Sequence, residues 1–208
     1  MLSAWEAALG SRAEALHPRI REYVRAVPTG FVGRGEGVFT EAGSSSTVLR
    51  PALRLAARWG IAFAERGASI PFTIENRGDA RGAVRARREL RFPERRRVMV
   101  DLVREQRGRV VDALGRGGRL EAALRVGVRD GALTARSGAV RVRLGRLWWR
   151  VPAPVRPTVC LVERWDESVG RQHVDVSVTL PGFGRIYGYH GWFDYAVEPD
   201  LQGRGAHG

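Results

Sequence analysis

The clearest hydrophobic pattern in the chain lies near its C-terminal end, over residues 173–197. From Val174 to Leu180, apolar side chains occupy every second position and polar side chains occupy the positions between them. This period of two is typical of a β-strand with one buried face. The turn-forming segment 181–184, Pro-Gly-Phe-Gly, then interrupts the alternation. We therefore predict a β-hairpin whose second strand sends Tyr187, Tyr189, Phe193 and Tyr195 to one face and Ile186, His190, Trp192 and Asp194 to the other.

Similar short alternating segments recur after Ile61, separated by turn signals such as Asp130-Gly131. Successive strands with turns between them favour an antiparallel meander over βαβ units. A sheet of about nine or ten such strands tends to curl or close. The proline-flanked segment 147–149 is expected to cross the rim of this sheet. In the segment 98–102, the alternating apolar residues are Val98, Val100 and Leu102. The predicted strands lie near residues 70–74, 84–92, 98–102, 110–111, 120–128, 140–144, 159–165, 173–180 and 185–197.

Before the sheet, residues 3–27 carry apolar side chains at helical spacing. Pro18 does not fit a helix interior, so we expect two helices, the second starting at Pro18 with a structural His17 beside its N-terminus. These helices are expected to cover an open end of the sheet, with a partner-binding role as the alternative. A further helix is predicted over 47–59, capped by the serines at 44–46.

The glycines at 33, 35 and 37 suggest a phosphate-binding loop, but their context does not fit one. They lead into Val38-Phe39-Thr40, which has the character of a strand, whereas the dinucleotide fingerprint opens a helix. We therefore predict a flexible or bulged strand here.

Together these patterns predict an α+β chain dominated by an antiparallel sheet, curled or closed into a lipocalin-like barrel, with N-terminal helices. A helix-grip sheet is the alternative, and it is disfavoured because no long helix follows the last strand. We expect a single domain over 1–199, formed by a helical arm with one early strand (1–60) and the sheet (61–199), and a disordered tail at 200–208.

Composition adds little to this fold prediction. No segment approaches the ~20 apolar residues of a membrane span, and the N-terminus lacks the basic and apolar regions of a signal peptide. The lone Cys160 excludes an intramolecular disulfide and is expected to be a small core residue. We expect a soluble, cytoplasmic protein.

The net charge of +13 raises the question of nucleic-acid binding. All 35 basic side chains are arginines, and they are spread along the chain among abundant Ala, Gly and Val, which indicates a compositional bias. The sequence carries no recognisable helix-turn-helix or RNA-binding aromatic motif. A nucleic-acid partner is therefore not expected.

The sequence contains no established catalytic motif, so candidate chemistry depends on spacing. His173 and Asp175 share a face of one hairpin strand, and His190 lies on the partner strand. These three could serve as acid–base groups, and their residue types also suit a metal ion, although most polar strand residues simply face water. The sequence predicts no particular metal ion or cofactor.

Arg88 is the second candidate, because it lies in phase with the apolar residues of its strand, Val84, Ala86, Leu90 and Phe92. An inward arginine needs an acidic partner, either a carboxylate such as Glu163 or a bound acid. The neighbouring Arg85, Arg87 and Arg91 would form a cationic outer face that meets solvent, with a bound anion as the alternative. The candidate ligand-binding residues are Arg88, Tyr187, Tyr189 and Trp192.

Several segments resemble the bacterial family catalogued as domain of unknown function 4166. The resemblance covers nearly the whole chain and is most specific at Pro181–Gly191, with its P-G-x-G-x-x-x-x-Y-x-G pattern. It implies no activity, but some members are similar to C-terminal partners of saccharopine-dehydrogenase-like domains, so it implies association with a nucleotide-binding oxidoreductase domain. The resembling segments are LHPRIRE at 16–22, IPFTIENRGD at 70–79, RRELRFP at 87–93, RVVDALGRGGRLEAAL at 109–124 and the hairpin at 173–193.

From these features we expect a β-barrel module that binds a small, partly apolar and possibly acidic molecule. One alternative is an isomerase, cyclase or dehydratase that uses His173, Asp175 or His190 for acid–base chemistry. The other is a structural or partner-binding subunit that uses the N-terminal helices.

The compositional origin of the arginines makes a prediction. Binding to duplex DNA or RNA, measured by fluorescence anisotropy, should be weak and should disappear at physiological salt, because exposed arginines only neutralise phosphates. Tight, sequence-dependent binding in that salt would contradict this interpretation.

Overall fold

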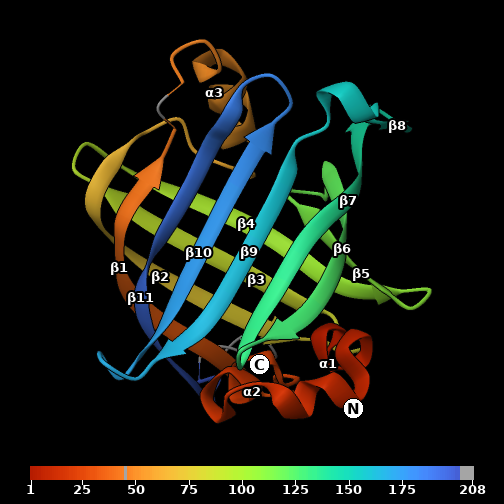
Figure 1. Cartoon of the computed structure of the whole chain (residues 1–208), viewed down its shortest axis with the longest axis vertical. Helices are drawn as coiled ribbons and strands as arrows, with labels where there is room; N and C mark the ends of the chain where they lie inside the picture. The colour runs from red at the N-terminus through yellow and green to blue at the C-terminus, as the bar shows by residue number, and fades with distance from the viewer. Residues whose placement is uncertain (45, 202–208) are drawn as a thin grey trace, which may run out of the picture.

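In the computed structural model, which describes residues 1–44 and 46–201, the chain forms a closed antiparallel β-barrel with short helices at its two ends (Figure 1). The helical elements are α1 (Ala4–Leu9), η1 (Gly10–Ala15), α2 (Pro18–Val24), α3 (Arg50–Arg58) and η2 (Ala153–Val155). The strands are β1 (Phe31–Gly43), β2 (Gly67–Gly78), β3 (Val84–Phe92), β4 (Arg95–Gln106), β5 (Arg109–Leu114), β6 (Leu120–Arg129), β7 (Ala132–Leu144), β8 (Leu147–Arg150), β9 (Thr158–Asp166), β10 (Arg171–Leu180) and β11 (Gly184–Pro199).

Neighbouring strands in the barrel are mostly neighbours in sequence. The order is β6-β5-β4-β3-β2-β1-β11-β10-β9-β7-β8, and an additional β6–β7 pairing closes the sheet. Every pairing is antiparallel. The predicted meander and lipocalin-like barrel are therefore confirmed, and β8 forms a short hairpin with the end of β7, at the rim where the segment 147–149 was expected.

The glycine-rich segment is strand β1, as predicted, and it is bulged between Phe39 and Glu41. Glycines in β1 allow close approach of the neighbouring strand: a Cβ at Gly37 would lie 2.1 Å from the Trp192 carbonyl oxygen. The strand therefore requires small residues where β11 crosses it closely.

The phase predicted for β4 is wrong. Val98, Val100 and Leu102 were expected to form its apolar alternation, but the buried inward residues are Met99, Asp101 and Val103. Both faces of β4 carry apolar side chains, so hydrophobic periodicity alone does not distinguish them.

The N-terminal helices cover one end of the barrel, as predicted (Figure 1). Ser3 and Glu6 form a capping box at the start of α1. His17 caps α2 by accepting a hydrogen bond from the Arg19 backbone N–H, with Pro18 in the first turn. His17 also stacks on Trp165 of β9, so its predicted structural role is confirmed. The apolar stripe of this segment is buried on the sheet through Leu9, Leu16, Ile20 and Val24.

Helix α3 lies at the opposite end of the barrel (Figure 1). It begins at Arg50, three residues later than predicted. Leu49 occupies the N-cap position, and its side chain makes no capping hydrogen bond. The Ser46 hydroxyl instead accepts a hydrogen bond from the Leu49 N–H at 3.4 Å, within the turn that precedes the helix.

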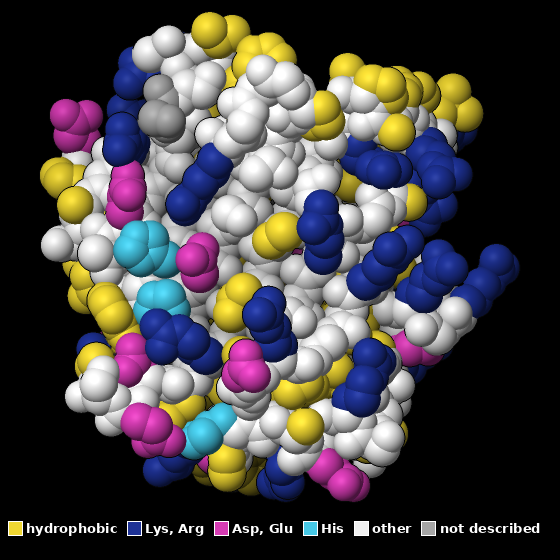
Figure 2. Space-filling view, in the orientation of Figure 1, with side chains coloured by type: hydrophobic (Ala, Val, Ile, Leu, Met, Phe, Trp, Pro, Cys, Tyr) yellow, Lys and Arg dark blue, Asp and Glu magenta, His cyan; other side chains and the backbone are white. Residues whose placement is uncertain are grey.

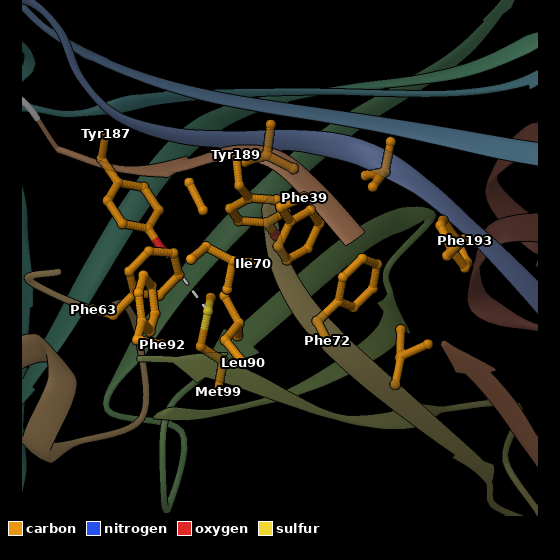
Figure 3. Close-up of a cluster of buried hydrophobic side chains, with 14 residues drawn as sticks. Phe39, Phe63, Ile70, Phe72, Leu90, Phe92, Met99, Tyr187, Tyr189 and Phe193 are labelled. Atoms are coloured by element: carbon orange, nitrogen blue, oxygen red, sulfur yellow. Dashed lines mark hydrogen bonds between the residues drawn. The ribbon is translucent and has the colours of Figure 1, made fainter. Parts of the chain in front are cut away.

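The largest buried cluster runs through the barrel interior, from Phe63 near α3 to Phe193 beside Tyr23 of α2, and is rich in aromatic rings. Phe39 and Phe72 stack with their ring centroids 3.8 Å apart. Figure 3 shows Tyr187, Phe63 and Phe92 gathered around Met99, whose sulfur lies 3.8 Å from the Tyr187 hydroxyl. The hairpin face predicted to carry Tyr187, Tyr189 and Phe193 is therefore the inner face.

Two predictions about the side chains on the outer face of the barrel are wrong. The face of β3 is not purely cationic, because Glu89 lies between Arg87 and Arg91 and pairs with both. Cys160 is only partly buried, because it alternates with the cavity-lining Val159 and Leu161 and so faces outward.

The predicted tail lies mostly outside the described residues, since 202–208 are not among them. Asp200, its first residue, is held in place by the Arg77 side chain and by a backbone hydrogen bond of 2.8 Å to Gly30. No helix among residues 1–44 and 46–201 is long and apolar enough to cross a membrane.

Candidate functional site: a cavity with a buried polar cluster

A cavity of about 370 Å³ occupies the barrel interior. Trp5 and Val27 line it at the N-terminal-helix end, and Leu49, Leu53 and Ala56 of the α3 segment line it at the other. Most of its wall consists of aliphatic and aromatic side chains. The cavity therefore extends along the barrel from one set of helices to the other.

Arg88 projects from β3 into this cavity, as its phase predicted. Its guanidinium donates a hydrogen bond to Asp101 on the adjacent strand β4. Burial is the largest single influence and lowers the pKa of Arg88, but the Asp101 carboxylate, together with smaller effects of Tyr189 and Tyr23, raises the pKa above its ordinary value. The protein itself thus supplies the acidic partner that an inward arginine requires.

Glu163 reaches the same cavity from β9, across the barrel from Arg88. It accepts a hydrogen bond of 2.8 Å from Gln172, and only 5% of its surface is exposed. Burial raises the pKa of Glu163 to about 7, against the opposing effects of the Arg88 charge and of hydrogen bonds with Gln172 and Tyr23. This carboxyl group can therefore hold or release a proton near neutral pH.

Two further polar side chains in the cavity wall have an unused hydrogen-bonding atom. Among the described residues, Asn76 Oδ1 and Asp112 Oδ1 are buried without a hydrogen-bond partner. The Asn76 amide N–H donates to the Tyr195 hydroxyl, at 3.3 Å. Burial, and secondly the Asp101 charge, raise the pKa of Asp112 well above its usual range. These atoms are available to a molecule inside the barrel.

The polar lining is completed by tyrosines at four positions, 23, 187, 189 and 195. Burial is the main cause that raises the pKa of Tyr189 and of Tyr195 to about 12, and that of Tyr23 well above its usual value. Their hydroxyls are therefore neutral at physiological pH and can donate as well as accept hydrogen bonds.

The predicted ligand-binding residues are divided between two places. Arg88, Tyr187 and Tyr189 line the cavity. Trp192 does not: its ring packs edge-on against His173, with centroids 5.0 Å apart, and its indole N–H donates to Asp166 at 3.3 Å. Trp192 alternates with the buried Phe193, so it lies on the outer face of β11.

The predicted catalytic trio also lies on the outer face. His190 is directly opposite Asp175 across β10 and β11, and the rings of His173 and His190 are 6.2 Å apart. Burial, and next the Arg164 charge, lower the pKa of His173, so it is neutral at pH 7. In the described part of the chain, no cluster of three or more His, Cys, Asp or Glu side chains could hold a metal ion. The structure thus brings the trio together, but away from the cavity.

The sequence interpretation identified Arg88 and suggested Glu163, but it missed Asp101, Asp112, Asn76 and Tyr23. Asp101 and Asp112 each occur within an apolar strand segment, which is the available sequence signal for a charged residue that faces inward. Tyr23 belongs to the apolar stripe predicted for the N-terminal helices. Its interactions with Glu163, Arg88 and Asn76 depend on how helix α2 packs on the barrel.

The raised pKa of Glu163 makes a prediction about stability. Because the folded protein holds this proton more tightly than the unfolded chain, whose pKa is near 4.5, Glu163 should reduce the free energy of unfolding as pH rises from about 4.5 to about 7. The full reduction should be about 3 kcal/mol. Glu163→Gln should remove it, as measured by urea denaturation at about pH 5 and about pH 8.

Glu36→Gln on the exposed face of β1 is the matched control and should leave the pH dependence unchanged. The same pH dependence in Glu163→Gln as in the unmodified protein would contradict the assignment.

Comparison with known proteins places the chain in a family without assigning it a reaction. No protein of curated function matches the sequence. The model of the family described as domain of unknown function DUF4166 matches residues 16–193, which include most of the barrel and its cavity-lining strands. The chain belongs to the DUF4166 family.

Proposed function

We propose that this protein binds one small, largely apolar molecule inside the barrel. The observation that carries the proposal is the cavity of about 370 Å³, whose apolar wall contains buried polar atoms without partners, Asn76 Oδ1 and Asp112 Oδ1. Sites for small molecules typically have this composition, with volumes of about 300–1,000 Å³. Barrels of similar size commonly enclose one ligand.

The polar cluster indicates what functional groups the ligand carries. A hydroxyl or amide N–H of the ligand could donate to Asn76 Oδ1, and the neutral Asp112 carboxyl can donate or accept. The aromatic wall around Phe39 and Tyr189 suits a ring or an acyl chain. The molecule should therefore be mostly hydrocarbon with one or two hydrogen-bonding groups.

An acidic ligand is less favoured than the sequence suggested. Arg88 already pairs with Asp101, and the cavity wall also contains Asp112 and Glu163. A ligand carboxylate would have to compete with these groups for the guanidinium. An uncharged or weakly basic polar group avoids that competition.

Acid–base catalysis in the same cavity is the second candidate, and the pKa of about 7 for Glu163 is the observation that favours it. A carboxyl group with such a pKa can give or take a proton at neutral pH, as an isomerase, cyclase or dehydratase requires. Glu163 is better placed for this role than His173, Asp175 or His190, because it faces the cavity. The alternative of partner binding through the N-terminal helices receives less support, since their apolar stripe packs against the sheet.

Native mass spectrometry of the protein purified from its own host tests the binding proposal. The protein should carry a small molecule, and Ala135→Phe, which fills the cavity from β7, should reduce its retention at least about tenfold. Incubation with the released molecule then separates binding from catalysis: an unchanged compound indicates a binding module, and a product formed only with intact Glu163 indicates an enzyme.

Ala196→Phe on the exposed face of β11 is the matched control and should retain the molecule. Equal retention by Ala135→Phe, or a protein that carries nothing from its host, would contradict the proposal.

A further inference from the structure

Exposed apolar side chains gather at the α3 end of the barrel. They come from the α3 segment, from the β7–β8 hairpin, from η2 and from the β10–β11 turn (Figures 1 and 2). We refer to residues 47–58, 144–155 and 181–183 as the α3-end rim. Its exposed members are Val48, Leu55, Leu144, Leu147, Trp148, Trp149, Val155 and Phe183, and Leu147 is the most exposed of the hairpin, at 77%.

The segments that lead into this rim and form it are cationic and lack carboxylates over long stretches. Residues 131–162 contain six arginines and no Asp or Glu, and residues 42–64 contain three arginines and no Asp or Glu. Among the described residues, only Arg141 of these nine forms a salt bridge, with Glu121. The space-filling view shows arginines on the β7–β8 side, directly below the apolar tip (Figure 2).

The β7–β8 hairpin combines these two features within a few residues. Leu144 lies opposite Leu147 at its tip, and Arg141 lies opposite Arg150 below it. Like charges directly opposite one another destabilise a strand pair. A negatively charged surface against the hairpin would remove that repulsion.

We propose that the α3-end rim docks on an anionic phospholipid bilayer. Exposed tryptophan and leucine side chains enter the interfacial region of a membrane, where the amphipathic indole ring is favoured. Arginines behind them pair with lipid phosphates, and the attraction of basic residues to anionic lipids adds to the hydrophobic contribution. A nucleic acid would use the arginines but would give the leucines at the tip no partner.

The rim also forms one wall of the cavity. Leu49, Leu53 and Ala56 face the cavity, whereas Val48 and Leu55 are exposed on the outside of the same segment. Docking would therefore hold the α3 end of the cavity against the lipid surface. The docking proposal stands independently of ligand binding, because its evidence lies wholly on the exterior.

Co-sedimentation of the full chain with vesicles tests the proposal. The protein should bind vesicles of equal parts phosphatidylcholine and phosphatidylglycerol at least about tenfold more tightly than pure phosphatidylcholine vesicles. The double variant Leu147→Ser/Trp149→Ser should lose the hydrophobic contribution to vesicle binding. The double variant Arg146→Glu/Arg150→Glu should lose the electrostatic contribution. Each double variant should bind the mixed vesicles at least about tenfold more weakly. If the arginine double variant unfolds, Arg146→Gln in the exposed β7–β8 turn replaces it.

Val169→Ser and Arg129→Glu are the matched controls, because both residues are exposed at the opposite end of the barrel. They should bind vesicles as the unmodified protein does. Equal binding to both vesicle types, undiminished binding by the rim variants, or equal losses in the controls would overturn the proposal. Displacement from the vesicles by duplex DNA, with the same dependence on Arg146 and Arg150, would assign the surface to nucleic acid instead.

Discussion

The enclosure of a charged, largely buried arginine inside a closed barrel is the constraint on which the interior depends. The β6–β7 pairing closes the sheet, so Arg88 cannot reach bulk water around a strand edge. An unpaired buried charge costs several kcal/mol, and Asp101 on the adjacent strand provides the counter-charge. Closure also fixes the barrel circumference, and the side chains leave part of the enclosed volume unfilled. The cavity and its polar cluster thus follow from the same closed sheet.

The charges inside the barrel affect one another because they share a small, poorly hydrated space. Asp101 pairs with Arg88, and its charge helps to keep Asp112 protonated. For Glu163, burial outweighs the lowering effects of the Arg88 charge and of hydrogen bonds with Gln172 and Tyr23, so its pKa is raised. The neutral Asp112 carboxyl, the Glu163 carboxyl with its pKa of about 7, an amide and phenols therefore line a largely apolar cavity, which favours uncharged hydrogen-bonding groups in a ligand. The exterior is different, since arginines are spread over it and those of the β7–β8 hairpin lie below its apolar tip in a segment without Asp or Glu.

The architecture was largely predictable because strand periodicity and turn residues are local signals. The closing hairpin, the bulged strand β1 and the helix starting at Pro18 were all identified from such signals. The site was only partly predictable: Arg88 stood out as a charge in an apolar phase, whereas Asp101 was hidden because both faces of β4 are apolar. Asn76 and Tyr23 join the site only through closure of the barrel and docking of α2, which are long-range events that a sequence pattern does not record. The polar phase of His173 and Asp175 already indicated that they lie on the solvent-facing side of β10. Only the structure shows that the cavity lies on the other side of that strand.

A double-mutant cycle on Arg88 and Asp101 tests most directly whether the chain itself balances its interior charge. In ligand-free protein, Arg88→Met and Asp101→Leu should each reduce the free energy of unfolding by about 3–5 kcal/mol, because each leaves its partner buried and unpaired. The double variant should be more stable than either single variant, since no uncompensated charge remains. An unchanged free energy of unfolding in Arg88→Met would contradict the account, because it would mean that a bound acid, and not Asp101, is the true partner of this arginine.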